Sequence, residues 1–266
     1  MRHITASDFR YPALWNGCVY AHSAGLGVTG TLAVDSSIRK NNGTITNADM
    51  TTVWSVSENR YSLLFDATND HILLPSSAVL LTSGSPYSVS WWERVTSNTN
   101  TFPSRFCLDV AGSSSYWICF RSTNATYSSI TWGVSPAAGS DSNKSSTSPS
   151  LASSVGIWRH WCITGSDPIS TNIATQSLRV DSVSYTVENM AGTLGTVATN
   201  RIGHDGTDSG SDCRLDDIRI YNCILTEGQI RLLSTRRGIA YETIHRRSYK
   251  TAAVAGNRRR RLLIGS

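Results

Sequence analysis

The sequence lacks most of the short motifs that mark enzymes. It has no CxxC pair, no HExxH and no GxSxG, so zinc ribbons, zincins and serine hydrolases are not indicated. Each glutamate lacks an acidic residue two positions later, whereas retaining glycosidases hold two carboxyls about 5–5.5 Å apart. The neighbours Asp216 and Asp217 are expected to point to opposite faces of a strand. We therefore expect a protein that is not an enzyme.

Charge is scarce and unevenly distributed. Only 16% of the residues are charged, and the formal net charge is +5. From residue 236 to the end there are eight Arg, one Lys and one Glu, a net charge of 9 − 1 = +8, which leaves 5 − 8 = −3 for residues 1–235. This asymmetry predicts a mildly acidic body, residues 1–235, and a basic C-terminal tail, residues 236–266.

Long apolar runs are also missing. The opening residues, MRHITASDFRYPALW, contain nothing like a signal peptide, and no stretch approaches a membrane span. We therefore expect no export signal and no membrane partner. Without export, the six cysteines are expected to be mostly reduced thiols in the core.

Short apolar runs separated by Gly, Ser, Thr and Asn are abundant. Residues 87–91 (YSVSW) alternate with the period of a half-buried strand, and residues 215–221 alternate after one break at the paired aspartates. One short helix is expected to begin after Thr226 as N-cap and to end near Gly238. The predicted fold is all-β: a two-sheet antiparallel jelly-roll sandwich with one short C-terminal helix and an extended basic tail.

Two weaker patterns favour structural roles. Residues 25–30 (GLGVTG) match GxGxxG, but no amphipathic helix follows, so a glycine-rich turn is expected instead of a dinucleotide site. The histidines are scattered without metal-ligand spacing. His160 is expected to lie on a strand with a satisfied hydrogen bond.

Six segments between residues 14 and 233 form an ordered series. They are DSS with NNGT at 35–44, LLFDATNDHILLP at 63–75, YSVSWW at 87–92, WRHW at 158–161, RIG at 201–203 and LDDIRIYNCILTEGQI at 215–230. Together they resemble the laminin-G-like (concanavalin A-like) jelly-roll family, of the kind found in bacterial surface proteins and phage virions. The resemblance implies the sandwich fold and places Trp92 and Trp158 in the core.

The resemblance also implies one metal to consider, a structural Ca²⁺; no cofactor is otherwise expected. Related jelly rolls hold this ion with an aspartate of the closing strand, which Asp216 matches. Several more oxygens would have to come from loops around 66–70 or 205–212. The alternative is that Asp216 and Asp217 cap the strand or pair with Arg219 or the tail.

Tryptophan is plentiful, with eight residues. Aromatic rings stack on sugar faces, and Trp91 and Trp132 are the candidates for an exposed glycan platform.

The tail combines arginines with an apolar end. The expected partner-binding residues are Arg236, Arg237, Tyr241, Arg246, Arg247, Arg258, Arg259, Arg260, Arg261, Leu262, Leu263 and Ile264. Arginine makes bidentate contacts with carboxylates and phosphates, and such a segment can order on another protein's surface. The run RRGIAYE with a basic end is similar to phage-encoded members of the family. We expect attachment to a protein assembly; a solvated tail and nucleic-acid binding are the alternatives.

The first expectation is therefore a virion structural protein, a capsid decoration or fibre-associated domain. It would be held to other virion proteins by its tail, assembled in the host cytoplasm and present as repeated copies or a homo-oligomer. Weak contacts with cell-surface glycans would gain avidity from the repetition. The second is a stand-alone carbohydrate-binding module on a bacterial surface or secreted, and the third is a glycoside hydrolase.

Overall fold

The structure is a computed structural model. It describes residues 9–66, 68–75, 85–96, 104–109, 117–122, 130–133, 144–146, 155–166, 177–185, 200–203 and 212–243. In the four ranges between 104 and 146, it describes the course of the backbone.

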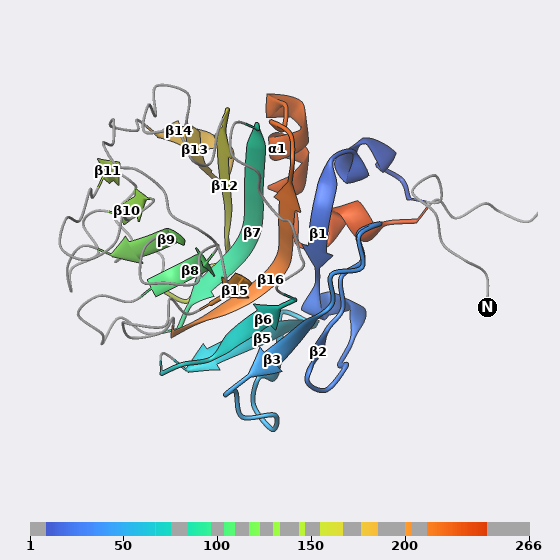
Figure 1. Ribbon diagram of the computed structural model, residues 1–266, viewed down its shortest axis with the longest axis vertical. Helices are drawn as coiled ribbons and strands as arrows, with labels where there is room; N and C mark the ends of the chain where they lie inside the picture. Colours follow the sequence, from blue (N-terminus) through green and yellow to red (C-terminus); the bar gives the residue numbers. More distant parts are fainter. Residues whose placement is uncertain are drawn as a thin grey trace, which may run out of the picture.

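The described strands form two sheets in which every pairing is antiparallel (Figure 1). Sheet I has the order β14–β13–β12–β7–β16–β5–β4, and β1 also pairs with β16. Its strands are β1 (Cys18–His22), β4 (Trp54–Ser57), β5 (Arg60–Asp66), β7 (Tyr87–Val95), β12 (Arg159–Gly165), β13 (Ser177–Val180), β14 (Val183–Tyr185) and β16 (Asp212–Tyr221).

Sheet II has the order β11–β10–β9–β8–β15–β6–β3–β2. Its strands are β2 (Leu32–Ala33), β3 (Gly43–Thr46), β6 (His71–Leu74), β8 (Ser104–Asp109), β9 (Trp117–Ser122), β10 (Ile130–Gly133), β11 (Lys144–Ser146) and β15 (Asn200–Ile202). The predicted all-β sandwich of two antiparallel sheets is confirmed.

The described residues include one short α-helix, α1 (Glu227–Leu233), as predicted. Thr226 is its N-cap: the Gln229 N–H donates to the Thr226 hydroxyl, and the Thr226 N–H donates to Gln229 Oε1. The predicted start of the helix is confirmed. The helix ends at Leu233, before the expected Gly238, which is instead a left-handed residue before a 3₁₀ turn. Single 3₁₀ turns are η2 (Pro12–Trp15), η3 (Ala24–Leu26) and η5 (Ile239–Tyr241). None of the helices described has the length and apolar character needed to cross a membrane.

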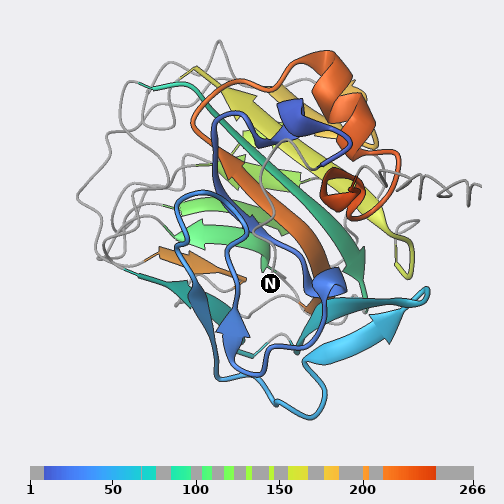
Figure 2. The same ribbon diagram turned by 90° about the vertical axis from the view of Figure 1, so that its right-hand side faces the viewer.

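Apolar side chains form two layers, one on each face of sheet I. The first layer lies between the sheets and includes Phe65, Val89 and Trp91 from sheet I and Ile72 and Ile202 from sheet II. The second lies on the outer face of sheet I, where α1, η2 and η5 cover it (Figures 1 and 2). Its members are Leu14, Cys18, Ala21, Cys162, Tyr221, Leu225, Ile230, Leu233, Ile239 and Ala240. Sheet I is therefore buried on both faces where these segments cover it.

Cysteines contribute to both layers as free thiols. Cys18, Cys162 and Cys213 are buried, and Cys223 is partly buried. Burial raises the pKa of the Cys18 and Cys162 thiols to about 12, which keeps them protonated and unreactive. The expected reduced thiols are confirmed at these positions.

The predicted boundary between body and tail at residue 235 is wrong by about eight residues. Residues 236–243 pack against the body: Ile239 and Ala240 are buried, and Phe9 forms a β-bridge with Thr243. The Arg10 N–H also donates to the Glu242 carbonyl at 2.6 Å. The apolar side chains of this stretch complete the outer layer of sheet I, so the described body extends to Thr243.

Candidate functional site

The two adjacent aspartates of β16 lie at a β-bulge. Asp216 pairs with Trp92 of β7 and Arg219 pairs with Ser90, so Asp217 and Ile218 together oppose Trp91. Asp217 has a φ of 47°, in the left-handed region that short polar residues tolerate best after glycine.

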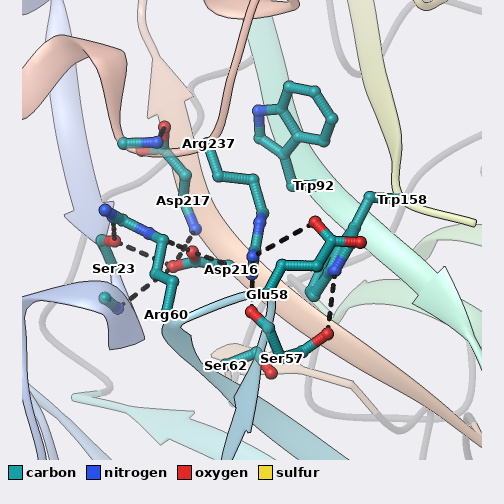
Figure 3. A network of polar contacts seen from close by, with 12 residues as sticks. Ser23, Ser57, Glu58, Arg60, Ser62, Trp92, Trp158, Asp216, Asp217 and Arg237 are labelled. Carbon is teal, nitrogen blue, oxygen red and sulfur yellow. Dashed lines mark hydrogen bonds and ion pairs between the residues drawn. The ribbon is translucent and has the colours of Figure 1, made fainter.

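The bulge shifts the alternation of the strand. The residues of β16 that face the inter-sheet core are Cys213 and Leu215 before the bulge and Ile218 and Ile220 after it. Both carboxylates consequently reach the outer side of sheet I (Figure 3). The expectation that they point to opposite faces is wrong, because it assumed a regular strand.

Asp216 is fully buried and receives donors from three other parts of the chain (Figure 3). Its Oδ1 accepts from the Ser23 hydroxyl at 2.8 Å and from the Gly25 N–H at 3.4 Å. Its Oδ2 accepts from Arg60 Nε at 2.8 Å and lies 3.7 Å from Arg237 Nη1. The carboxylate is therefore neutralised by two guanidinium groups.

Glycines make room for one of these groups. A Cβ atom at Gly25 or at Gly238 would overlap the Arg60 guanidinium. Gly25 belongs to the segment that matches GxGxxG, and its N–H donates to Asp216. Gly25 in the 25–30 turn thus has a structural role, as expected: the absence of a side chain there leaves room for the Arg60 guanidinium.

Asp217 has a different partner. Its Oδ1 accepts from Arg219 Nε at 2.9 Å, and its Oδ2 accepts from the Gly238 N–H at 2.9 Å. Arg219 is fully buried, with its guanidinium 4.6 Å from the Trp15 ring centre and 4.5 Å from that of Tyr241. This cation–π arrangement ties the closing strand to both ends of the described chain.

Arg237 lies at the centre of the cluster with its side chain 7% exposed. Its Nη2 donates to the Ser57 carbonyl at 2.8 Å, and its guanidinium carbon lies 4.0 Å from the centre of the Trp158 ring. The Trp158 indole in turn donates to the Ser57 hydroxyl at 3.2 Å. We call Asp216, Asp217, Arg60, Arg219 and Arg237 the arginine–aspartate cluster.

The contacts of Asp216 match one of its two interpretations, while the calcium interpretation stays a prediction because most of the 205–212 loop lies outside the described residues. Within the described residues, no group of three or more His, Cys, Asp or Glu side chains could hold a metal. Guanidinium groups contact Asp216 where the calcium interpretation expected an ion. The alternative, in which Asp216 and Asp217 pair with Arg219 and residues assigned to the tail, describes the contacts that are present.

A second buried polar pair lies on the same face. Ser90 Oγ and His160 Nε2 are 2.9 Å apart, and the His160 ring lies 5.5 Å from that of Trp92. Ser90 and His160 are each 1% exposed, so this serine–histidine contact cannot meet a substrate. Burial lowers the pKa of His160 to about 4. The prediction of a strand histidine with a hydrogen bond is confirmed.

One of the two predicted glycan tryptophans is buried. Trp91 is 0% exposed and stacks on Trp161, with ring centres 6.1 Å apart, inside the inter-sheet core. Its assignment as an exposed residue is wrong. Trp132 lies in β10, where the structure describes the backbone, and its side chain lies outside the described part of the chain, so its exposure stays a prediction.

Three of the remaining predicted site residues lie before Thr243, and the others lie after it. Arg237 and Tyr241 are partly buried and contact Asp216 and Arg219 of the body, and exposed Arg236 pairs with Glu242. They are therefore not part of a free arm. The other nine predicted tail residues lie in 244–266, outside the described residues. They are Arg246, Arg247, Arg258, Arg259, Arg260, Arg261, Leu262, Leu263 and Ile264.

Sequence reasoning missed one member of the cluster, Arg60. It lies 156 positions from Asp216, and no local pattern joins the two residues. The break in alternation at residues 216–217 was the only available signal of the bulge.

The carboxylates of the arginine–aspartate cluster are not accessible to a substrate. Asp216 and Asp217 are 0% and 2% exposed, and their oxygens already accept hydrogen bonds from the chain. Carboxyls of a glycosidase must reach the glycosidic oxygen and the anomeric carbon. The arrangement is suited to joining β5, β16 and the C-terminal stretch of the body.

Comparison with known proteins agrees with this fold. A family model described as the concanavalin A-like lectin/glucanases superfamily matches residues 66–231, more than half of the chain. No curated protein sequence matches the chain. Among solved structures, a sialidase from Trypanosoma rangeli in complex with sialic acid has a TM-score of 0.58 at 15% identity, over 82% of this chain and 33% of the sialidase. The chain thus spans about a third of that enzyme.

Two separate domains of other proteins are similar as well. Domain 4 of the extracellular arabinanase AbnA from Geobacillus stearothermophilus, in complex with arabinotriose, has a TM-score of 0.52 at 20% identity, covering 82% of this chain and 98% of the domain. The binding domain of Paraclostridial mosquitocidal protein 1 has a TM-score of 0.52 at 14% identity, covering 83% of this chain and 52% of that one. At these identities the likeness concerns the fold.

Substituting Arg60→Ala should destabilise the protein by about 3 kcal/mol, because it removes the closest charge partner of buried Asp216. Urea unfolding followed by tryptophan fluorescence measures this. Arg39→Ala, at an exposed arginine, is the matched control and should change stability by less than about 0.5 kcal/mol. Equal effects of the two substitutions would contradict a structural role for the cluster.

Acidification from pH 6.5 to pH 4 should destabilise the protein partly through His160. Its pKa is lowered to about 4 in the folded state, so the unfolded chain, with a pKa of about 6.5, binds the proton first. The contribution is fully present above pH 6.5 and is lost as pH falls, by about 3 kcal/mol in total. The free energy of unfolding of His160→Gln should therefore fall less steeply over this range. An unchanged slope would refute the assignment.

Proposed function

The chain belongs to the concanavalin A-like lectin/glucanases superfamily, and on that premise we propose that it is a non-catalytic module that recognises carbohydrate. The family description covers both lectins and glucanases, so the choice between binding and hydrolysis depends on the carboxylates of this chain. The observation that carries the proposal is the arginine–aspartate cluster. The paired aspartates of the closing strand share one face, yet arginines and backbone N–H groups occupy their oxygens.

Two further carboxylates of the described residues are also engaged by the chain itself. Asp35, also fully buried, accepts from the backbone N–H groups of Ala21, Ser37 and Asn41, at 2.7–2.9 Å. Asp181 pairs with Arg159 at 2.6 Å. Within the described part of the chain, these carboxylates serve the fold. The arabinanase domain solved with arabinotriose supports carbohydrate as the ligand class, since this chain covers nearly all of that domain.

The full-length protein should bind at least one member of an oligosaccharide panel with a Kd of about 1 mM or tighter, without cleaving it. A suitable panel is arabinotriose, cellotriose, maltotriose and chitotriose as neutral members, with sialyllactose as the acidic one. Calorimetry measures binding, and a reducing-sugar assay over several days measures turnover. Release of reducing ends that survives purification would overturn the non-catalytic assignment, and absence of binding across the panel would overturn carbohydrate recognition.

A second role is proposed for the C-terminal segment, which we define as residues 244–266. It contains six Arg, one Lys and no acidic residue, a net charge of +7, so residues 1–243 carry 5 − 7 = −2. We propose that this segment attaches the module to an acidic surface of a larger assembly, of which a virion shell or fibre is our specific candidate. Arginine clusters followed by Leu262, Leu263 and Ile264 supply both charged and apolar contacts to such a surface.

Truncation after Thr243 should abolish attachment while preserving the fold, because residues 236–243 belong to the body. In the organism that encodes the chain, the full-length protein should sediment with particles on a density gradient and the truncated form should not. A full-length variant with Arg258–Arg261 replaced by serine tests charge alone. Equal sedimentation of all three forms would refute the attachment, and loss of sedimentation after nuclease treatment would assign the segment to nucleic acid.

A further inference from the structure

Two arginines of sheet I lie directly opposite each other. Arg214 of β16 pairs with Arg94 of β7 in the strand register. Arg214 lies between Cys213 and Leu215, which face the inter-sheet core, so its side chain is on the outer side of sheet I. Arg94 is on the same side, because directly paired residues of antiparallel strands share a face. We call Arg94 and Arg214 the arginine pair.

The arginine pair lies away from the segments that cover the outer face of sheet I. The register of β7 with β16 runs from Ser88 opposite Tyr221 toward the arginine pair. Tyr221 belongs to the apolar layer under α1, η2 and η5, and α1 lies beside the start of β7 (Figure 1). The arginine pair is at the other end of this register, and both residues are partly exposed.

The described partners of the arginine pair are neutral. Arg94 Nη1 donates to the Ser57 hydroxyl at 2.8 Å, and Arg214 Nη1 donates to the Ser55 hydroxyl. No carboxylate of the described residues forms an ion pair with either guanidinium, in contrast to the arginines of the arginine–aspartate cluster. Like charges at directly opposed positions of a sheet destabilise it, so the fold holds an uncompensated repulsion here.

The protonation of Arg214 reflects the same repulsion. Burial lowers the pKa of its guanidinium, and the neighbouring charge of Arg94 lowers it further. Arginine nevertheless stays charged at neutral pH. An anion placed between the two guanidinium groups would therefore be attracted by both and would offset their repulsion.

The free donors of the arginine pair are open to solvent. Nε and Nη2 of both residues have no hydrogen-bond partner among the described residues, and none of these four atoms is buried. Nε and Nη2 form one edge of a guanidinium, the fork that donates two parallel bonds to the two oxygens of a carboxylate. Because the serines occupy Nη1, each arginine keeps this fork for a ligand.

We propose, on the premise of the proposed function, that the arginine pair binds the carboxylate of an acidic saccharide. Neighbouring strands are about 4.8 Å apart, so two forks at opposed positions can contact one carboxylate together. The Ser55 hydroxyl accepts from Arg214 and keeps its own hydrogen for a sugar oxygen. Glu58, which follows Ser57 and lies 3.8 Å from Arg237 (Figure 3), adds a negative charge on this side and disfavours a doubly charged phosphate.

The first test compares two sugars that differ by a carboxylated residue. Full-length wild type is titrated by calorimetry with sialyllactose and with lactose, and sialyllactose should bind at least about tenfold tighter, because lactose offers no charge to the forks. Raising NaCl from about 50 mM to about 500 mM should weaken binding of sialyllactose and leave lactose unchanged, because salt screens the attraction.

The second test removes the forks one at a time. Arg94→Gln and Arg214→Gln should each weaken sialyllactose by at least about tenfold and change lactose by less than about twofold. Neither should lower the melting temperature by more than about 2 °C, since each relieves a like-charge repulsion. Arg39→Ala, at an exposed arginine, is the control and should change both Kd values by less than about twofold. If a Gln variant is less stable than this, the Lys variant at that position decides: it keeps the charge but lacks the fork, and should also weaken sialyllactose.

The outcomes separate the site from the proposed function. If wild type binds lactose or a neutral trisaccharide as tightly as sialyllactose, the inference is wrong and the proposed function stands. The same holds if sialyllactose is preferred but the variants of both arginines bind it as wild type does. If wild type binds no sugar, both fail. Displacement of sialyllactose by an equal concentration of inorganic phosphate would show a site for free oxyanions and would overturn the saccharide ligand.

Discussion

The rest of the structure depends on the compensation of two adjacent buried carboxylates on one face of a strand. The bulge at Asp217 brings both aspartates to the outer side of sheet I. Two uncompensated charges there would cost several kcal/mol each, so the fold must deliver cations to them. It does so from β5, from β16 itself and from the stretch after α1, through Arg60, Arg219 and Arg237.

This requirement explains why residues 236–243 belong to the body. Arg237 reaches Asp216 and Trp158 only if the chain after α1 turns back across sheet I, and Gly238 provides that turn with a left-handed conformation. The following residues, Ile239 and Ala240, then cover the apolar layer, while Tyr241 contacts the Arg219 guanidinium. Charge compensation and apolar burial thus act together, and the basic segment for which we propose other partners is the one after Thr243.

The same cluster holds several elements of sheet I in place. A buried ion pair adds little net stability compared with apolar packing, but breaking one is costly, so the cluster restrains β5, β16 and the C-terminal stretch in one arrangement. The buried charges of sheet I therefore have a structural role in the domain.

Local pattern in the sequence determined the fold class, the start of α1 and the charge asymmetry, because each depends on residues close together in the chain. The alternation in 87–91, the Thr226 cap and the arginine run near the C-terminus are of this kind. Alternation also divides a strand into two faces, but it does not say which face is inside, so Trp91 was assigned to the surface. Only the tertiary structure decided the partners of Asp216 and the packing of residues 236–243 against the body. Those features arise from contacts between segments far apart in sequence, where a single left-handed residue, Asp217, changes which side chains meet.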